Sequence, residues 1–228
     1  MNTSMPNLNP RLFKIASLLE PCRCLADIGT DHGYIPIYAL SKGLCEKAIA
    51  SDINPGPLAR AKEHAEQMGL EDKIDLRLGG GLSTLEEGEA DTIVIAGMGG
   101  LLIAEILENS PEIVKGAITL ILQPMTAQAE LREYLSRGGY TLEKEFLVAE
   151  EEKLYNIFMI KVGGETHYTP KELLLGKDIE ADEELLRLHF EKIQRKLRIR
   201  LEGLEKSSLA ESKRDAEEVR KLLDVINS

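Results

Sequence analysis

The segment Leu25–Gly33 combines a short apolar run, an acidic residue and a turn that contains glycine at two places. Residues 24–28 have the length of a buried parallel strand, and Asp27 lies near its carboxyl end. The two glycines allow a sharp turn in which the backbone lies close to a ligand. The next helix begins near Tyr34, so its N-terminal amides face the same place. Strand, turn and helix together predict one side of a nucleotide-shaped pocket.

A second acidic residue, Asp52, ends the apolar run 48–52, which is followed by a proline and a helical pattern. An acid at the end of the second strand can accept hydrogen bonds from both hydroxyls of a ribose. The turn has Asp31 where the dinucleotide fingerprint has its middle glycine, which disfavours a nicotinamide oxidoreductase. Phosphate groups would be repelled by Asp27, Asp31 and Asp52, whereas a sulfonium cation would not. The acids therefore favour S-adenosylmethionine over a nicotinamide cofactor.

Glycine-rich loops follow two further strand-like runs. Gly79–Gly81 either allows an adenine ring to approach the backbone closely or forms a flexible turn. Gly97–Gly100 follows the fourth strand, which neighbours the first across the switch in strand order, so this loop leaves room for a second flat molecule beside the cofactor. Within it, Met98 packs either on a base or on the core. Gln123–Met125 lines the same mouth or is an ordinary turn.

Alternating strand and helix patterns position these residues. Apolar runs predict strands at 24–28, 48–52, 74–78, 92–96 and 119–122, and amphipathic or capped segments predict helices at 10–20, from 34, at 55–68, 101–108 and 126–136. Two longer runs, 140–148 and 154–162, are separated only by a short polar loop and predict an antiparallel hairpin. We therefore expect an α/β fold with a doubly wound, seven-stranded, mainly parallel sheet, which is the Rossmann-like architecture of class I methyltransferases.

Beyond Gly163–Gly164 and Pro170, which mark a linker, the apolar spacing changes. Apolar residues recur at intervals of three and four from Leu186 to Leu204, and a second such stripe runs from Leu209 to Ile226 after the interruption at Ser207–Ser208. Two helices joined by a short turn form an antiparallel hairpin. We expect two domains: residues 1–164, which bind the cofactor, and residues 165–228, a coiled-coil-like helical hairpin.

The formal net charge of −11 argues against indiscriminate binding to nucleic acid. Its distribution is uneven, because residues 1–165 hold 15 Lys and Arg against 25 Asp and Glu, whereas residues 166–228 hold 13 against 14. A basic cluster stands out in the second part: Arg187, His189, Lys192, Arg195, Lys196, Arg198 and Arg200. This cluster is either a solvated helix face with partners four residues away or a surface that binds phosphates.

Cysteine usage and the N-terminal sequence indicate the compartment. Cys22, Cys24 and Cys45 lack the spacing of a zinc site and leave one residue over after any pairing, which favours a reduced protein. The first residues lack the charged-then-apolar pattern of a signal peptide, and no run of about 18 apolar residues exists. We expect a cytoplasmic protein without a membrane span and without a metal ion.

The chain resembles the bacterial tRNA (adenine-22-N1)-methyltransferases in four segments: Asp27–Pro36, Ala50–Pro55, Ala96–Gly100 and Leu122–Met125. The segment that begins at Leu154 and the C-terminal hairpin are also similar, so the resemblance covers nearly the whole chain. The Asp-His turn together with the Gly-Met-Gly-Gly loop is specific, although each alone is not. Two departures are visible: Gly33 stands where the family often has alanine, and Gly80 where many relatives have a polar residue that can touch the adenine.

The resemblance implies S-adenosylmethionine-dependent methylation of N1 of an adenine in tRNA, expected at position 22. N1 has a free lone pair, so positioning replaces a strong base, and the base must be unpaired to react. A carboxylate can stabilise the cationic product. The expected catalytic residues are Asp31, Met98 and Gly99. The expected cofactor-binding residues are Asp27, Gly29, Thr30, Gly33, Asp52, Ile53, Gly80, Gly81, Leu82 and Gly97.

Two other functions stay open at this point. An enzyme of the same fold could act on another RNA, a protein or a small molecule. A non-catalytic interaction module could keep a degenerate pocket and act through its helical hairpin, and Gly80 is the feature that favours it. The expected partner is tRNA, and the sequence is compatible with either a monomer or a homodimer.

Overall fold

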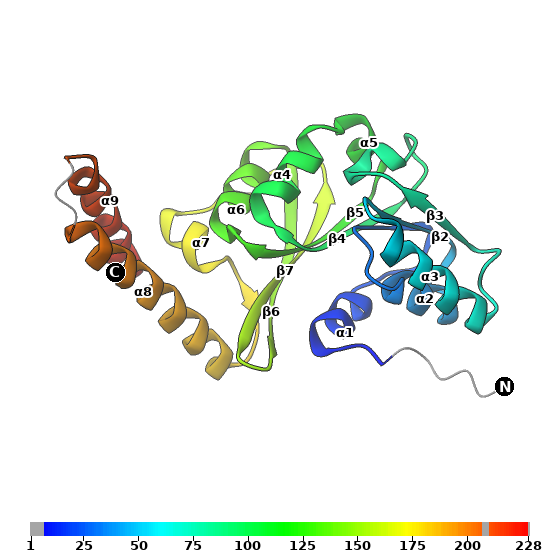
Figure 1. Cartoon of the computed structure of the whole chain (residues 1–228). Coiled ribbons are helices and arrows are strands. Elements are labelled where there is room, and N and C mark those ends of the chain that lie inside the picture. The colour runs from blue at the N-terminus through cyan, green and yellow to red at the C-terminus, as the bar shows by residue number, and fades with distance from the viewer. Residues whose placement is uncertain (1–6, 207–209, 228) are drawn as a thin grey trace.

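The computed structural model describes residues 7–206 and 210–227 as a helix-flanked sheet with a helical hairpin at one end (Figure 1). The eight strands have the spatial order β3-β2-β1-β4-β5-β7-β6-β8. Their bounds are β1 Cys22–Ile28, β2 Cys45–Asp52, β3 Ile74–Leu78, β4 Thr92–Gly99, β5 Thr119–Thr126, β6 Tyr140–Glu150, β7 Lys153–Val162 and β8 Ile179–Glu180. Strands β1 to β5 are parallel, and β7 is antiparallel to both β5 and β6.

Nine α-helices and one 3-10 helix precede, connect or follow these strands in the described residues. Their bounds are α1 Pro10–Ser17, α2 Tyr34–Ser41, α3 Pro55–Met68, η1 Gly81–Thr84, α4 Gly100–Glu108, α5 Pro111–Gly116, α6 Gln128–Arg137, α7 Pro170–Leu175, α8 Glu183–Glu205 and α9 Ala210–Asn227. The predicted α/β architecture is confirmed, including the placement of the fourth strand beside the first. In the described part of the chain, no helix is long and apolar enough to cross a membrane.

The sheet has one strand more than predicted. The two-residue strand β8 pairs in parallel with β6, where Ile179 lies opposite Glu145, so β6 is not the sheet edge. A strand of two residues has no alternation of apolar and polar positions, and the sequence therefore does not show it.

Alternate residues of the central strands form two apolar layers, because successive side chains of a strand point to opposite faces. On one face Ile93 and Leu120 pack with residues of α4, α5 and α6. On the other face Val94 and Ile121 pack with residues of α1, α2 and α3. This double cover buries the strands completely and places their carboxyl ends at one edge of the sheet.

The segment predicted as a linker is folded against the sheet. The Thr166 hydroxyl accepts a hydrogen bond from Leu142 N and donates to Tyr140 O, at 2.6 and 3.1 Å. Helix α7 begins at a capping box in which Thr169 and Glu172 satisfy each other's backbone amides. The division of the chain into domains at residue 164 stays a prediction.

Helices α8 and α9 form the predicted hairpin. Its interior contains Leu197, Val219 and Ile226, with Leu174 and Leu175 of α7 packed against it. Hydrogen bonds from Gln194 to Asn227 and from Arg220 to Glu205 show that the two helices run antiparallel. Leu186, at the start of the predicted seam, is 37% exposed. The predicted break at Ser207–Ser208 and the seam residue Leu209 lie outside the described residues.

A buried ion pair connects helix α7, which forms the base of the hairpin, to the sheet. Arg132 of α6 donates two hydrogen bonds to Glu145 of β6, and both side chains are fully buried. Arg132 also donates to the carbonyl oxygens of Leu173 and Leu174 in α7. Because every charged atom has a partner, this pair fixes the position of α7 relative to the sheet.

Candidate active site

A cavity of about 590 Å³ opens where β1, β2, β3 and β4 end. Ligands of doubly wound proteins bind at this edge, at the switch in strand order, which here lies between β1 and β4. Eight of the predicted site residues line the cavity: Gly29, Asp52, Ile53, Gly80, Gly81, Leu82, Gly97 and Met98. The volume lies within the range of pockets for small molecules and cofactors.

The turn after β1 brings backbone and Met98 together. Gly29 has a φ of +74°, and a Cβ atom at this position would lie 2.1 Å from the Met98 Cε atom. The Met98 side chain therefore reaches from the carboxyl end of β4, which extends beyond the predicted strand 92–96, across the turn after β1. It also packs against the core on the α4 side of the sheet, while it lines the cavity. A side chain at position 29 would displace the end of Met98 and would be strained by the positive φ, so glycine suits this position.

Asp52 presents a carboxylate at the end of β2. Its Oδ1 atom accepts a hydrogen bond of 2.7 Å from Asn54 N, at the start of α3. Within the described residues, no protein donor reaches Oδ2. One oxygen is thus held in place by the backbone while the other stays available to a ligand hydroxyl. Ile53 beside it is 69% exposed, so a large apolar side chain stands at the cavity rim.

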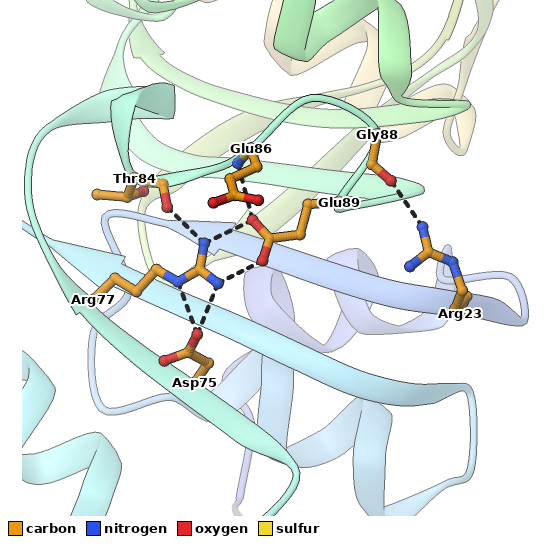
Figure 2. A network of polar contacts seen from close by, with 7 residues as sticks. All are labelled: Arg23, Asp75, Arg77, Thr84, Glu86, Gly88 and Glu89. Atoms are coloured by element: carbon orange, nitrogen blue, oxygen red, sulfur yellow. Dashed lines mark hydrogen bonds and ion pairs between the residues drawn. The ribbon is translucent and has the colours of Figure 1, made fainter.

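The loop after β3 forms the opposite wall, and a charged network holds it (Figure 2). Arg77 pairs with Glu89 and Asp75 and donates a hydrogen bond of 2.6 Å to Thr84 O, at the end of η1. The Glu89 carboxylate also accepts from Glu86 N. The Arg77 bonds lower the pKa of Glu89, which keeps this carboxylate ionised and paired with Arg77 at neutral pH. It fixes the backbone that carries Gly80 and Leu82.

Gly80 has room for a side chain. A Cβ atom there would meet only the Ile53 Cγ2 atom, at 3.4 Å, and the backbone has an ordinary extended conformation. The absence of the polar residue expected at this place is therefore not imposed by crowding.

Asp27 lies under the turn, outside the residues that line the cavity. Its side chain is almost completely buried, and burial raises its pKa to about 6, with Asp31 and Asp52 adding to the rise. The nearby Thr30 hydroxyl partly offsets this rise in the pKa of Asp27, although the geometry between the two groups does not meet the criteria for a hydrogen bond. The hydroxyls of Thr30 and Ser51 are both buried and have no hydrogen-bond partner in the described part of the chain. With a pKa of about 6 the Asp27 carboxyl is still largely ionised at neutral pH, so it can bind the cationic end of a ligand.

Asp31 faces solvent more than the cavity. Its side chain is 74% exposed and pairs with Arg60 and His32 at 3.4 and 3.3 Å. His32 has a φ of +62°, which turns its ring toward Tyr34 and His64, with which it stacks at centroid distances of 5.2 and 5.6 Å. Asp31 therefore belongs to a charged and aromatic surface next to the cavity.

The other predicted site residues hold the shape of the site. Gly33 caps α2 and contacts Ala61 of α3, Thr30 is buried, and Gly99 lies beside Thr126 of β5. Gly79 of the predicted glycine-rich loop also lines the cavity, together with residues outside the expected site set: Asn54, Ser83, Ala96, Leu102, Glu105, Ile106, Asn109 and Ser110. Several of them share one face of α4, where spacings of three and four residues within the predicted helix 101–108 could have revealed them.

The cavity fits S-adenosylmethionine chemically. A carboxylate with a free oxygen suits a ribose diol, glycine backbone and apolar walls suit an adenine ring, and a buried acid suits a cationic amino acid end. Among the described residues, no group of three His, Cys, Asp or Glu could hold a metal ion.

Comparison with known proteins extends this assignment. A family model described as a methyltransferase domain matches residues 8–158. The curated tRNA (adenine(22)-N(1))-methyltransferase of Bacillus subtilis (strain 168) is 40% identical over 156 residues, which are 68% of this chain and 66% of that protein.

Two solved structures match along almost their full length. The crystal structure of the Bacillus subtilis m1A22 tRNA methyltransferase has a TM-score of 0.85 and 30% identity, covering 97% of both chains. The structure of a Streptococcus pneumoniae protein named as a putative tRNA (m1A22) methyltransferase, in complex with S-adenosyl-L-methionine, has a TM-score of 0.82 and 30% identity, covering 95% of this chain and 96% of that one. The chain therefore belongs to the class I methyltransferases and, among them, to the tRNA (adenine-22-N1)-methyltransferase family.

Proposed function

We propose that this protein transfers a methyl group from S-adenosylmethionine to N1 of adenine 22 in tRNA. The observation that supports this most strongly is the match with m1A22 tRNA methyltransferases along nearly the whole chain, the C-terminal helices included. The cavity at the switch point, with its ribose-binding carboxylate, supplies the chemical side of the argument. When bound, the cofactor supplies a methyl group on a sulfonium, which is already reactive toward a nitrogen lone pair.

The protein contributes to the reaction by binding the cofactor and the target base, by orienting them, and by excluding water from between them. In this proposal Asp52 accepts hydrogen bonds from the ribose hydroxyls, and Gly80 to Leu82 contact the adenine ring of the cofactor. Gly97, Met98 and Gly99 leave room for the target base beside the methyl group. No side chain has to remove a proton, because N1 attacks with its own lone pair, so alignment provides much of the rate.

The direct test is nucleoside mass spectrometry. The protein is incubated with S-adenosylmethionine and unmodified tRNA, and 1-methyladenosine is measured and mapped to its position. A tRNA with guanine at position 22 is the control, and it should stay unmethylated at that position. A panel of ribosomal RNA, protein and small acceptors tests the alternative substrates. Methylation of another acceptor in preference to tRNA would contradict the proposal.

Further parts of the assignment are proposals as well. The free cysteines Cys22, Cys24 and Cys45 suit a reducing compartment, and we propose a cytoplasmic protein that needs no metal. We also propose that the helical hairpin is a coiled-coil-like element that binds tRNA. The oligomeric state, monomer or homodimer, can be measured by light scattering.

Asp27 should make the cofactor-free protein less stable at neutral pH. Its pKa of about 6 exceeds the usual 3.8, so its contribution to stability is complete below pH ~4 and is lost as the pH rises through 6. Asp27→Asn should therefore stabilise the cofactor-free fold at pH 8 by up to about 3 kcal/mol and weaken cofactor binding. Urea unfolding at pH 5 and pH 8 measures the first effect. Asp72→Asn, at an exposed site, is the control, and an unchanged pH dependence in Asp27→Asn would refute the explanation.

Asp31 should affect the transfer step more than cofactor binding. In the proposed reaction, its carboxylate stabilises the positive charge that appears on the adenine ring. Asp31→Ala should lower the single-turnover rate at saturating tRNA and cofactor by about tenfold or more, with a small change in cofactor affinity. A variant with the wild-type rate would exclude this role and leave Asp31 as a partner of Arg60 and His32.

A further inference from the structure

Arg11 reaches from the first turn of α1 to the carboxyl ends of β4 and β5. Its Nη1 atom donates a hydrogen bond of 2.8 Å to Gln123 Oε1, and Gly97 N donates to the same oxygen at 3.1 Å. Gln123 is fully buried, and its Nε2 atom donates to Pro124 O, which fixes the orientation of the amide. One buried glutamine thus joins the arginine to a backbone amide that lines the cavity.

The charge of Arg11 is not neutralised by a carboxylate. Among the described residues 7–164, every other arginine makes an ion pair with Asp or Glu: Arg23, Arg60, Arg77, Arg132 and Arg137. Glu150, which lies close by, accepts a hydrogen bond from the Arg11 backbone amide instead. The guanidinium carbon lies 5.5 Å from the centroid of the Tyr155 ring. An unpaired cation is conspicuous in a part of the chain with an excess of acidic residues.

The position of Arg11 relative to the cavity is favourable for contact with a substrate. Gly97 has a φ of +79°, and a Cβ atom there would lie 3.9 Å from Arg11 Nη1, so the guanidinium borders the open side of this residue. Strand pairing places Met98 opposite Pro124, and the next residue, Met125, is 41% exposed. A half-buried cation and an exposed apolar side chain therefore lie at the mouth next to the proposed place of the target base.

We propose that Arg11 binds a phosphate group adjacent to the target adenine and so positions the extruded nucleotide. The inference rests on the proposed function, because it needs an RNA substrate. The guanidinium fork has donors left after the bond to Gln123, and it suits the paired oxygens of a phosphate. Gln123 and Tyr155 hold it in place before binding, which reduces the entropy cost of contact. A phosphate contact positions the RNA and reads no sequence, whereas the cavity mouth selects the base.

The test is a double-mutant cycle between protein and RNA. A tRNA assembled from two pieces carries an uncharged methylphosphonate in place of the phosphate on the 5′ or the 3′ side of adenine 22. Binding is measured by gel shift with S-adenosylhomocysteine present, so no methyl transfer occurs. For the wild-type protein, one of the two substitutions should weaken binding about tenfold. Arg11→Ala should bind natural tRNA about tenfold more weakly and show no further weakening with that substituted RNA.

The controls test whether the effect depends on the place of Arg11, on its charge alone, or on a loss of folding in the variants. Arg137→Ala removes a paired arginine at the far end of α6 and should leave binding and the cycle unchanged. A methylphosphonate in another stem should affect both proteins equally. Arg11→Lys keeps the charge without the fork and should give an intermediate loss, and calorimetry should show cofactor affinity within about twofold of wild type in every variant.

The outcomes are distinct from those of the proposed function. Additive losses in the cycle, or full wild-type affinity for both methylphosphonate RNAs, would overturn the role of Arg11 while methylation of adenine 22 still stood. A wild-type protein that does not methylate natural tRNA at adenine 22 would overturn the proposed function and this inference with it. Non-additive losses confined to one flanking phosphate would support the inference.

Discussion

Asp52→Ala should weaken the binding of S-adenosylmethionine by about 1.5–3 kcal/mol, the range for hydrogen bonds to a charged group. The structure gives the reason, because Asp52 lines the cavity with one carboxylate oxygen bonded to Asn54 N and the other without a protein donor among the described residues. Two ribose hydroxyls would bind to a carboxylate that is already fixed in orientation. Calorimetric titration of the cofactor into the variant measures the loss as roughly 10- to 150-fold in Kd.

Two comparisons make this result specific. Asp72→Ala removes an exposed carboxylate just before β3, at the opposite edge of the sheet, and should not change cofactor affinity. Asp52→Asn keeps an acceptor for Asn54 N but lacks the charge, so its affinity should fall between those of wild type and Asp52→Ala. Unfolding curves should show little change in stability, because Asp52 is only partly buried at a strand end. Wild-type affinity in Asp52→Ala would remove this residue from the cofactor site.

The fold was predictable because its strands have strong local patterns. The apolar runs around Ala26 and Ile93 are buried on both faces, which leaves little ambiguity about a parallel strand. Two six-residue helices were missed, since a segment as short as α5 or α7 completes less than two turns. For α7 a usable signal was present: Thr169 followed by Pro170 and Glu172 is a capping box with proline at the first helical position.

The site was less predictable than the fold. The ends of strands can be predicted from the sequence, whereas the directions of side chains in a turn cannot. Asp52 and Gly97 were assigned to the cavity from their positions after predicted strands, and they line it. Asp31 was expected to be catalytic, but its turn contains His32 in a left-handed conformation, and its carboxylate lies largely in solvent beside the cavity. The pairing of Arg11 with Gln123 joins residues 112 positions apart, and no local pattern indicates such a contact.

Reversal of the basic face of α8 should greatly weaken tRNA binding. Lys192, Arg195, Lys196 and Arg198 are exposed, and no ion pair involves them among the described residues, unlike Arg187, which pairs with Glu191. The pKa of Lys192 is lowered, first by desolvation of its side chain along the helix and then by the neighbouring charges of Arg195 and Lys196. A solvated helix face whose charges pair with residues four positions away therefore does not account for these four basic side chains.

One predicted member does not belong to that face. His189 is buried, its Nε2 atom lies 2.8 Å from Leu175 O in α7, and burial lowers its pKa, so the neutral ring packs against the hairpin base. The prediction that it adds to a basic surface was wrong, because helical position alone did not show that α7 covers it. The exposed cluster consists of the lysines and arginines.

The experiment uses the full chain, because the hairpin base is part of the folded body. A cut after Gly164 would remove the α7 carbonyl groups that bind the buried Arg132, as well as strand β8. Loss of those partners costs stability for reasons unrelated to RNA. Changing Lys192, Arg195, Lys196 and Arg198 to Glu leaves these bonds intact and alters only exposed side chains.

The quadruple Glu variant should bind tRNA roughly 100-fold or more weakly at low salt, because each bound phosphate releases counterions and charge reversal also adds repulsion. The slope of log affinity against log salt should fall by about 0.9 or less for each phosphate that the variant no longer binds. Cofactor affinity should stay at the wild-type value, since the changed residues lie outside the cavity. Gel-shift titrations at several salt concentrations, together with calorimetry, measure both effects.

A matched variant distinguishes this face from net charge. Changing Lys206, just after α8, and Lys213, Arg214 and Lys221 of α9 to Glu (the α9 variant) alters the chain's charge by the same amount elsewhere on the hairpin and keeps the Arg220–Glu205 ion pair. If the α8 variant loses affinity and the α9 variant does not, the α8 face binds the RNA backbone. Equal losses would mean that only the overall charge matters. Wild-type affinity and slope in the α8 variant would show that the hairpin serves stability or self-association, and the RNA would then have to bind around Arg11 and the segment Gly97–Gly100.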